Sequence, residues 1–197
     1  MRRLPDKTPP TLLPGLLEKS QVLPVPVDVG DPSRIEAHWP GAVSRVGPDI
    51  LRIAWVGRFE HDKGGEGLLR ILHGLEKARL DYEIAVTGRQ FRKSPDAFKT
   101  VGEAFAHRLV QLGFLPERHE DLALLRGADV VLSTADHEFQ GLAVMEAVAL
   151  GCVPILPDRQ VYPEWYPEEY LYLSAPQDPD REAAEAVEHI IRVAQAS

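Results

Sequence analysis

The sequence predicts an α/β fold built on a doubly wound parallel sheet. From residue 51 onward, short apolar runs alternate with longer segments in which apolar residues recur every three or four positions. These are the patterns of buried strands and of amphipathic helices. The segments between them are short and rich in turn-forming residues. Strands and helices that alternate in this way form a parallel sheet covered by helices.

The first strand is expected at residues 51–56, where the apolar run LRIAWV ends at a glycine. A leucine-rich stripe at helical spacing over residues 68–75 predicts the helix that follows it. A second strand is expected at residues 82–87, and it is also closed by a glycine. A long helix is then expected over residues 95–112. Its apolar stripe consists of Phe98, Val101, Phe105, Leu109 and Leu112.

The second half of the sheet follows the same rule. A short strand and turn are expected at residues 113–116, and a brief helix at residues 121–126. Further strands at residues 129–132 and 153–156 flank a helix that begins near Gly141. A last helix is expected over residues 182–194. The Asp178-Pro179-Asp180 stretch before it has the D-x-D shape of a metal-binding motif, but Asp180 is better explained as the helix cap than as a ligand.

Residues 1–50 have a different character, because they hold nine of the seventeen prolines and little contiguous apolar sequence. Proline breaks up long elements. A short helix at residues 12–18 and a strand-like stretch at residues 21–27 are expected, followed by a linker at residues 28–49. We interpret residues 1–50 as the tail of an absent N-terminal domain plus a linker.

Composition excludes several classes of protein. A net charge of −8 argues against non-specific binding to nucleic acids or membranes by this chain. The lone Cys152 rules out an internal disulfide framework and is typical of a reducing compartment. No apolar run approaches the length of a membrane span, so a cytoplasmic location is expected.

A first candidate site lies in residues 137–151, HEFQGLAVMEAVALG, at the turn between a strand and a helix. Gly141 and Leu142 would present backbone amides without intrahelical partners, and such amides bind anions. Glu138 and Glu146 bracket this helix start. The simpler explanation is that the two carboxylates only offset the helix dipole.

A second candidate site follows the first strand, in the stretch GRFEHDKG from Gly57 to Gly64. Parallel sheets bind ligands at the carboxyl ends of their strands, so Arg58 and Lys63 are expected at the same edge as Glu138. Fixed cations there would stabilise a departing diphosphate without a metal ion. Alternatively, both are ordinary surface cations. No dinucleotide-binding fingerprint, P-loop or zinc-ligand pattern is present.

Together, the two motifs resemble those of the retaining nucleotide-sugar glycosyltransferases with the two-domain GT-B fold. The resemblance implies that residues 51–197 form the C-terminal, Rossmann-like domain that binds the donor, with no metal or other cofactor. It implies that the amides of Gly141 and Leu142 bind the donor diphosphate. It further implies catalytic or binding roles for Arg58 and Lys63 at the diphosphate, Glu138 at the sugar and Glu146 at the ribose. Gly57 and Phe139 are expected among the substrate-binding residues.

His137 has two explanations that the sequence does not separate. It could hydrogen-bond the donor sugar or tune the neighbouring carboxylate, because histidine titrates near neutrality. It could equally be a turn residue without a role in binding.

The sequence after residue 156 resembles a narrower group. PDRQVYPE at residues 157–164 and EYLY at residues 169–172 are similar to the tRNA-queuosine mannosyltransferase family. This resemblance implies transfer of mannose from GDP-mannose, with retention, to queuosine in a tRNA. A nucleotide-sugar epimerase half-domain and a non-catalytic nucleotide-sugar-binding module are the alternatives. Without its acceptor domain, the chain alone is expected to be inactive.

Overall fold

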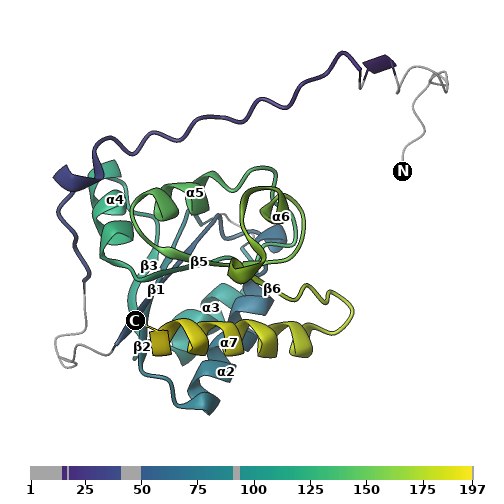
Figure 1. Ribbon diagram of the computed structural model, residues 1–197. Coiled ribbons are helices and arrows are strands. Elements are labelled where there is room, and N and C mark those ends of the chain that lie inside the picture. Colours follow the sequence, from purple (N-terminus) through teal and green to yellow (C-terminus); the bar gives the residue numbers. More distant parts are fainter. Residues whose placement is uncertain (1–14, 17, 41–49, 91–93, 197) are drawn as a thin grey trace.

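The computed structural model describes residues 15–16, 18–40, 50–90 and 94–196. Its centre is one sheet of six strands in the order β3-β2-β1-β4-β5-β6, in which all neighbouring strands are parallel (Figure 1). The predicted doubly wound α/β fold is therefore confirmed. The strands are β1 Leu51–Val56, β2 Tyr82–Thr87, β3 Leu109–Gly113, β4 Val130–Leu132, β5 Val153–Pro157 and β6 Leu171–Tyr172.

The strand order reverses between β1 and β4. From β1 the chain adds β2 and β3 on one side, and then returns to place β4 against the other side of β1. The connections that leave β1 and β4 therefore pass to opposite faces of the sheet. Such a reversal opens a crevice at the carboxyl ends of the two strands, where ligands bind in open α/β sheets.

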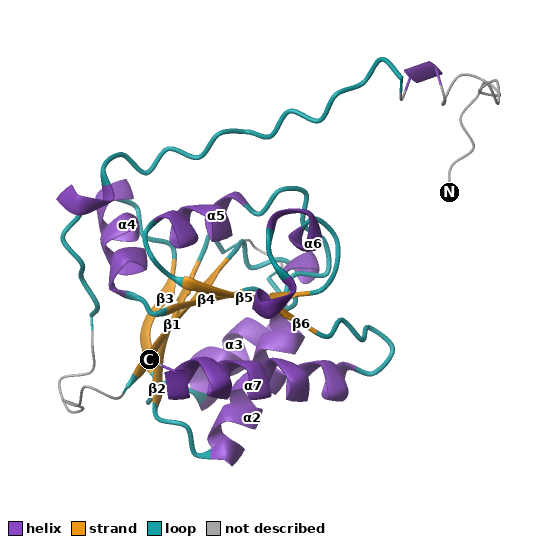
Figure 2. Cartoon of the chain, in the orientation of Figure 1, coloured by secondary structure: helices purple, strands orange, loops and turns teal. Residues whose placement is uncertain are grey.

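Helices cover both faces of the sheet (Figure 2). The alternation of side chains along β1 shows why: Ile53 and Trp55 pack into the core beneath α2 and α7, whereas Ala54 packs toward α4 and α5. Helices α2 Gly65–Ala78, α3 Asp96–Ala104 and α7 Pro179–Ala196 cover one face, and α4 Arg118–Gly127 and α5 Leu142–Ala149 the other. The shorter elements are α6 Tyr162–Trp165, η1 Pro32–Arg34, η2 His61–Lys63 and η3 Glu168–Tyr170.

The helix expected over residues 95–112 is wrong in its second half. Helix α3 ends at Ala104, and the chain then forms strand β3, which pairs with β2 from Ile84 to Thr87. The apolar spacing of the segment fits a helix, but β3 satisfies the backbone groups on the outer edge of β2. The demand for strand pairing therefore outweighs the local periodicity.

The strand-like stretch at residues 21–27 forms no strand. Pro24 and Pro26 lack the N–H groups that a sheet ladder requires, and the segment runs extended beside the domain (Figure 1). Val25 of this segment contacts Gln140, whose side-chain amide accepts from Val25 N at 2.8 Å and donates to Val25 O at 2.6 Å. The helix expected at residues 12–18 lies mostly outside the described residues.

Residues 28–40 pack against the domain more closely than the expected linker implied. Ile35 and Trp39 contact the apolar cluster beneath α4 and α5. The Trp39 indole Nε1 donates to Glu83 Oε2 at 2.8 Å, and His38 N donates to the main-chain oxygen of Ala123 at 2.9 Å. Residues 41–49 lie outside the described part, and the division into an N-terminal tail and a donor domain stays a prediction.

The cap of α7 is Asp178, not Asp180 as expected. Asp178 Oδ1 accepts a hydrogen bond from Arg181 N at 3.2 Å, while Pro179 starts the helix. Proline suits the first helical position, which shifts the cap to the residue before it. Asp180 lies in the first turn, where its carboxylate contacts Arg70 Nε at 3.2 Å.

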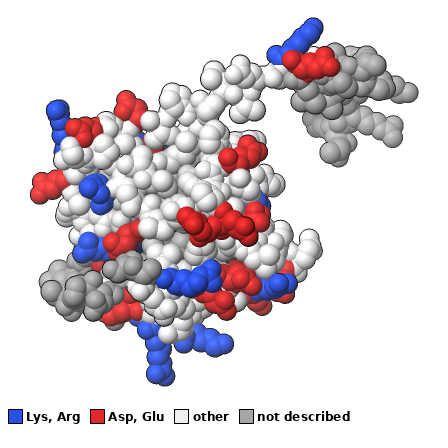
Figure 3. Space-filling view, in the orientation of Figure 1, with Lys and Arg blue, Asp and Glu red and all other residues white. Residues whose placement is uncertain are grey.

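Charge is distributed unevenly over the surface. On the face in Figure 3, acidic and basic side chains are interspersed over the domain, whereas the extended segment is nearly bare of charge. This matches its sequence, SQVLPVPV at residues 20–27. In the described part of the chain, no helix is both long enough and apolar enough to cross a membrane.

Candidate functional site

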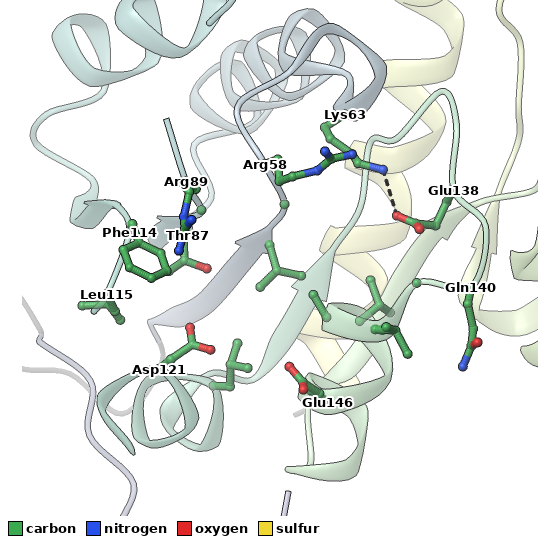
Figure 4. Close-up of a pocket in the computed structure, with 18 of the residues that line it drawn as sticks. Arg58, Lys63, Thr87, Arg89, Phe114, Leu115, Asp121, Glu138, Gln140 and Glu146 are labelled. Atoms are coloured by element: carbon green, nitrogen blue, oxygen red, sulfur yellow. Dashed lines mark hydrogen bonds and ion pairs between the residues drawn. The ribbon is translucent and has the colours of Figure 1, made fainter. Parts of the chain in front are cut away.

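A cavity of about 730 Å³ opens at the switch point of the sheet. Four strand ends contribute to its walls: Gly57 after β1, Gly88 after β2, Phe114 after β3, and residues 138–141 between β4 and α5 (Figure 4). The convergence follows directly from the parallel topology, because all carboxyl ends lie on one edge. The structure thus brings the two motifs from distant parts of the sequence around one space.

The two loops that carry the motifs touch through Gly64. This residue has φ 69°, and a Cβ atom built on it would lie 1.8 Å from the main-chain oxygen of Thr134. Only glycine allows both the backbone conformation and the approach. The N–H groups of Asp136 and His137 also donate to the oxygen of Asp62, at 2.9 and 3.2 Å.

The ammonium group of Lys63 connects the loop after β1 to the loop after β4. Its Nζ donates to the main-chain oxygen of His137 at 2.9 Å and to Glu138 Oε2 at 3.1 Å, and it lies 3.3 Å from Asp62 Oδ2. The side chain is only 11% exposed. Two hydrogen bonds and one ion pair therefore hold the ammonium group between the two loops.

Two arginines add positive charge at the same edge. Arg58 lines the cavity and pairs with Glu60 at 3.0 Å, with 57% of its side chain exposed. Arg89, which follows β2, lies over the ring of Phe114 at 4.8 Å from its centre. A cation at this distance from a ring face makes a cation–π contact.

Helix α5 points its N-terminus at the cavity. Gly141 is its N-cap with φ 75°, and Met145 N is the first amide to bond back, to Gly141 O at 2.9 Å. The preceding amides, including that of Leu142, therefore have no acceptor within the helix. This arrangement suits an anion.

Glu146 lies on α5, one turn deeper in the cavity wall than Leu142. Arg118 of α4 binds its carboxylate: Nη1 donates to Oε2 at 3.1 Å and Nη2 donates to Oε1 at 2.5 Å. The hydrogen bond to Glu146 raises the pKa of the Arg118 guanidinium. The carboxylate is thus held by two parallel bonds while still lining the cavity.

Eight of the nine residues singled out in the sequence line this cavity. His137 does not line it, although its main-chain oxygen accepts from Lys63. Phe139 is 97% exposed at the mouth. Their roles in binding stay predictions. The lining residues are Gly57, Arg58, Lys63, Glu138, Phe139, Gly141, Leu142 and Glu146.

Sequence reasoning missed six polar residues of the cavity: Asp62, Thr87, Arg89, Arg118, Asp121 and Gln140. The carboxyl ends of β2 and β3 obey the same rule as those of β1 and β4, and they lead to Arg89, Arg118 and Asp121. Burial raises the pKa of the Asp121 carboxyl, an effect that Arg118 partly offsets. Gln140 lies inside the first motif, but no pattern in the sequence predicts its contact with Val25.

Arg159 supports the β4 loop from behind. Its guanidinium donates to the main-chain oxygens of Ala135 at 2.8 Å and Thr134 at 3.4 Å. Its Nη1 also donates to both carboxylate oxygens of Glu182 on α7, at 2.8 and 2.9 Å. Both charged side chains are nearly buried, at 11% and 15% exposed. The residue lies in the stretch at 157–164 that the narrower resemblance highlighted.

Two tyrosines of the segments at 157–164 and 169–172 pack behind the end of β4. Tyr162 shares a 2.7 Å hydrogen bond with Ser133 Oγ, and the Tyr172 hydroxyl donates to Ser133 O at 2.8 Å. Both rings are buried. Their visible role is therefore to fix the end of β4.

The described residues hold no group of three or more His, Cys, Asp and Glu side chains arranged for a metal ion. Cys152 is buried, donates to Leu125 O at 3.1 Å, and has a thiol pKa raised by burial to about 12. Such a thiol is a poor nucleophile.

Comparisons with known proteins identify the family of the chain. The family model described as "Glycosyl transferases group 1" matches residues 47–194. A tRNA-queuosine alpha-mannosyltransferase of Drosophila melanogaster is 38% identical over 156 residues, which cover 79% of this chain and 41% of the relative. A GDP-mannose:cellobiosyl-diphosphopolyprenol alpha-mannosyltransferase of Xanthomonas oryzae pv. oryzae (strain PXO99A) is 29% identical over 105 residues, 53% of this chain and 28% of the relative.

Among solved structures, an alpha,alpha-trehalose-phosphate synthase (UDP-forming) from Burkholderia xenovorans has a similar fold. It superimposes with a TM-score of 0.57 at 19% identity, over 75% of this chain and 38% of that chain. The chain thus spans less than half the length of each of these three proteins.

Proposed function

Because the chain belongs to the group 1 glycosyl transferases, we propose that its cavity binds the nucleotide-diphosphate sugar that serves as donor in glycosyl transfer. The observation that carries this proposal is the contact between Lys63 and Glu138 at the switch point, beside the N-terminus of α5. A cation and helix amides that flank one space suit a diphosphate, and an adjacent carboxylate suits sugar hydroxyls.

The charges of the site match the charge that develops during transfer. When the bond between the anomeric carbon and the phosphate oxygen breaks, negative charge gathers on the diphosphate. Arg58, Lys63 and the free amides after Gly141 would stabilise that charge without a metal ion. Glu138 would orient the sugar, and Glu146 would accept hydrogen bonds from the ribose. The family resemblance implies retention of anomeric configuration, which we include in the proposal.

In this proposal, Lys63 exchanges a partner when the donor binds. Its ammonium group donates hydrogen bonds to oxygens of His137 and Glu138 and lies within ion-pair distance of Asp62. A diphosphate oxygen would replace one carboxylate contact, and the released Glu138 would become free to accept from a sugar hydroxyl. Binding of the diphosphate and binding of the sugar are thus coupled through one side chain.

We propose mannose as the sugar, GDP-mannose as the donor and queuosine in tRNA as the acceptor. The support is the 38% identity to a protein named tRNA-queuosine alpha-mannosyltransferase and the similarity to one named for GDP-mannose. Because this chain spans only part of those relatives, the proposal includes a second domain that binds the acceptor.

The test is a calorimetric titration of the chain with GDP, UDP and GDP-mannose. Lys63→Ala removes a charge-assisted contact and should weaken GDP binding by about 1.5–3 kcal/mol. Lys77→Ala is the matched control, because Lys77 is exposed in the last turn of α2 and does not line the cavity. It should leave the affinity unchanged.

The outcomes test donor binding and the choice of guanine as the donor base separately. Binding of GDP with the expected loss in Lys63→Ala supports donor binding at this cavity. Preference for UDP would overturn the guanine donor and leave glycosyl transfer standing. Equal losses in both lysine variants would show that only the net charge matters, which would contradict the proposed site.

A further inference from the structure

Two carboxylates enter the cavity from neighbouring helices and share one arginine. Arg118 Nη1 lies 3.4 Å from Asp121 Oδ2 on α4 and 3.1 Å from Glu146 Oε2 on α5. Figure 4 shows both carboxylates directed into the space between the strand ends. Glu146 has a role in the proposed function, whereas Asp121 has none.

Asp121 is built into the wall rather than left on the surface. Its side chain is 28% exposed, and the neighbouring Leu124 and Leu125 of α4 are buried in the core. The contact with Arg118 is long and reaches one oxygen. No other hydrogen bond to this carboxylate occurs within the described part of the chain. A partly desolvated carboxylate that faces a cavity with unused acceptor positions suits a ligand that brings two donors.

The position of Asp121 in the cavity indicates which part of the ligand it would contact. The cavity runs from Lys63 and Glu138 past Glu146 to Asp121, with Phe114 and Leu115 on the far wall (Figure 4). In the proposed function, on which this inference rests, the diphosphate lies at Lys63 and the ribose at Glu146. The nucleobase therefore extends toward Asp121.

We propose that Asp121 is the residue that selects guanine as the donor base. Guanine carries N1–H and an exocyclic N2 amino group side by side on one edge, and the two oxygens of a carboxylate can accept from both. Uracil offers a single N3–H between two carbonyl oxygens, which a carboxylate repels. Sites built to satisfy specific donors discriminate strongly against analogues that lack them. Arg118 acts as a positioning residue that keeps Asp121 and Glu146 in place.

The experiment compares GDP, IDP and UDP by calorimetry on the 197-residue chain and on Asp121→Asn. IDP keeps N1–H but lacks the 2-amino group, so it isolates the second hydrogen bond. The wild-type chain should bind GDP about tenfold more tightly than IDP. In Asp121→Asn, GDP should weaken by at least tenfold, UDP should change by less than about threefold, and the gap between GDP and IDP should nearly close.

Glu120→Gln is the matched control, because Glu120 is the exposed neighbour on α4 and does not line this cavity. It should leave all three affinities unchanged, and thermal melting by circular dichroism should show that both variants are folded. Equal weakening of GDP and UDP in Asp121→Asn would overturn the assignment, as would an unchanged gap between GDP and IDP. A wild-type chain that prefers UDP would also overturn it while leaving glycosyl transfer intact. Absence of binding to all three nucleotides would remove the proposed donor site itself.

Discussion

Lys63 Nζ lies 3.1 Å from Glu138 Oε2 and so joins the loop after β1 to the loop after β4. These residues are 75 positions apart in the chain. Their contact places one cation and one anion at the point where the proposed donor changes from diphosphate to sugar. The arrangement leads to a prediction that separates the two halves of the ligand.

Glu138→Gln should change the affinity for GDP-mannose and for GDP in opposite directions. The substitution removes the proposed acceptor for sugar hydroxyls, so GDP-mannose should bind less tightly. It also frees Lys63 and removes a charge that repels the diphosphate, so GDP should bind at least as well. We expect the ratio of the two dissociation constants to shift by about tenfold, as for the loss of one charged hydrogen bond. Titration calorimetry measures it, with the exposed Glu103→Gln on α3 as control; parallel changes for both ligands would contradict the assignment.

Glu146→Gln should reduce the ability of the site to distinguish ribose from deoxyribose. In the wild-type chain the carboxylate is proposed to accept from the ribose, so 2′-deoxy-GDP should bind about tenfold more weakly than GDP. The variant should narrow this difference to about twofold, because a neutral amide is a weaker acceptor. Fluorescence competition would measure the two constants. Glu188→Gln, exposed on α7, is the control, and an unchanged difference would place the ribose elsewhere.

Arg159→Met should destabilise the fold. The substitution removes the partner of Glu182, which is only 15% exposed, and leaves three carbonyl and carboxylate oxygens of residues 134–136 without their donor. Breaking a buried pair on one side costs about 3–5 kcal/mol. Urea unfolding should show a loss near the lower end of that range, while the exposed Arg181→Met should change stability by less than about 0.5 kcal/mol. A loss no larger than that of the control would show that the network contributes little.

Asp121→Asn should raise the melting temperature at neutral pH. Burial raises the pKa of the Asp121 carboxyl in the folded chain above its ordinary value of 3.8. The folded state therefore prefers the protonated acid, and the ionised acid lowers stability as the pH rises through the interval between the unfolded and folded values. The stabilising effect of the asparagine should be present at pH 7 and vanish near pH 3. Melting curves across this range test it, and a variant less stable than wild type at pH 7 would contradict the sign.

The 197-residue chain should show negligible transfer of mannose from GDP-mannose to queuosine-containing tRNA. Without a second domain the acceptor is not positioned, and positioning supplies a large share of catalytic rate. A radiolabel assay measures transfer, and mass spectrometry of the nucleotide sugar would reveal any epimer. Robust turnover by this chain would contradict the prediction, and formation of an epimer without acceptor would favour the epimerase alternative.

The strands that could be predicted are those whose apolar runs are unambiguous. β1, β2, β4 and β5 lie where short runs of buried residues end in glycine or small polar residues, and the edge that collects Gly57 and Glu138 follows from their parallel order. β3 was predicted too late, at residues 113–116 instead of Leu109–Gly113, because Phe98, Val101, Phe105 and Leu109 also fit a helical stripe. Only the unpaired edge of β2 decides between the two, and that edge exists only after the sheet has formed.

The site shows the same limit. Lys63 and Glu138 were predictable because each follows a strand in a short motif. Arg118, Asp121 and Arg159 depend on how α4, α5 and α7 pack around the sheet, so their local sequence carries little signal. Trp39 shows the same limit in the N-terminal segment. Its contact with Glu83 arises because Trp39 packs on the face of the sheet that α4 and α5 cover. No periodicity within residues 28–49 predicts this packing.

The hydrogen bonds of Arg159 connect helix α7 to the loop that lines the cavity, so α7 contributes to ligand affinity without contacting the ligand. A ligand that orders residues 134–138 also fixes the carbonyls that Arg159 holds, and through Glu182 it fixes the first turns of α7 on the far face of the sheet. Backbone amides there would exchange more slowly with solvent when the cavity is occupied. By the same linkage, substitutions in α7 can change binding without approaching the ligand.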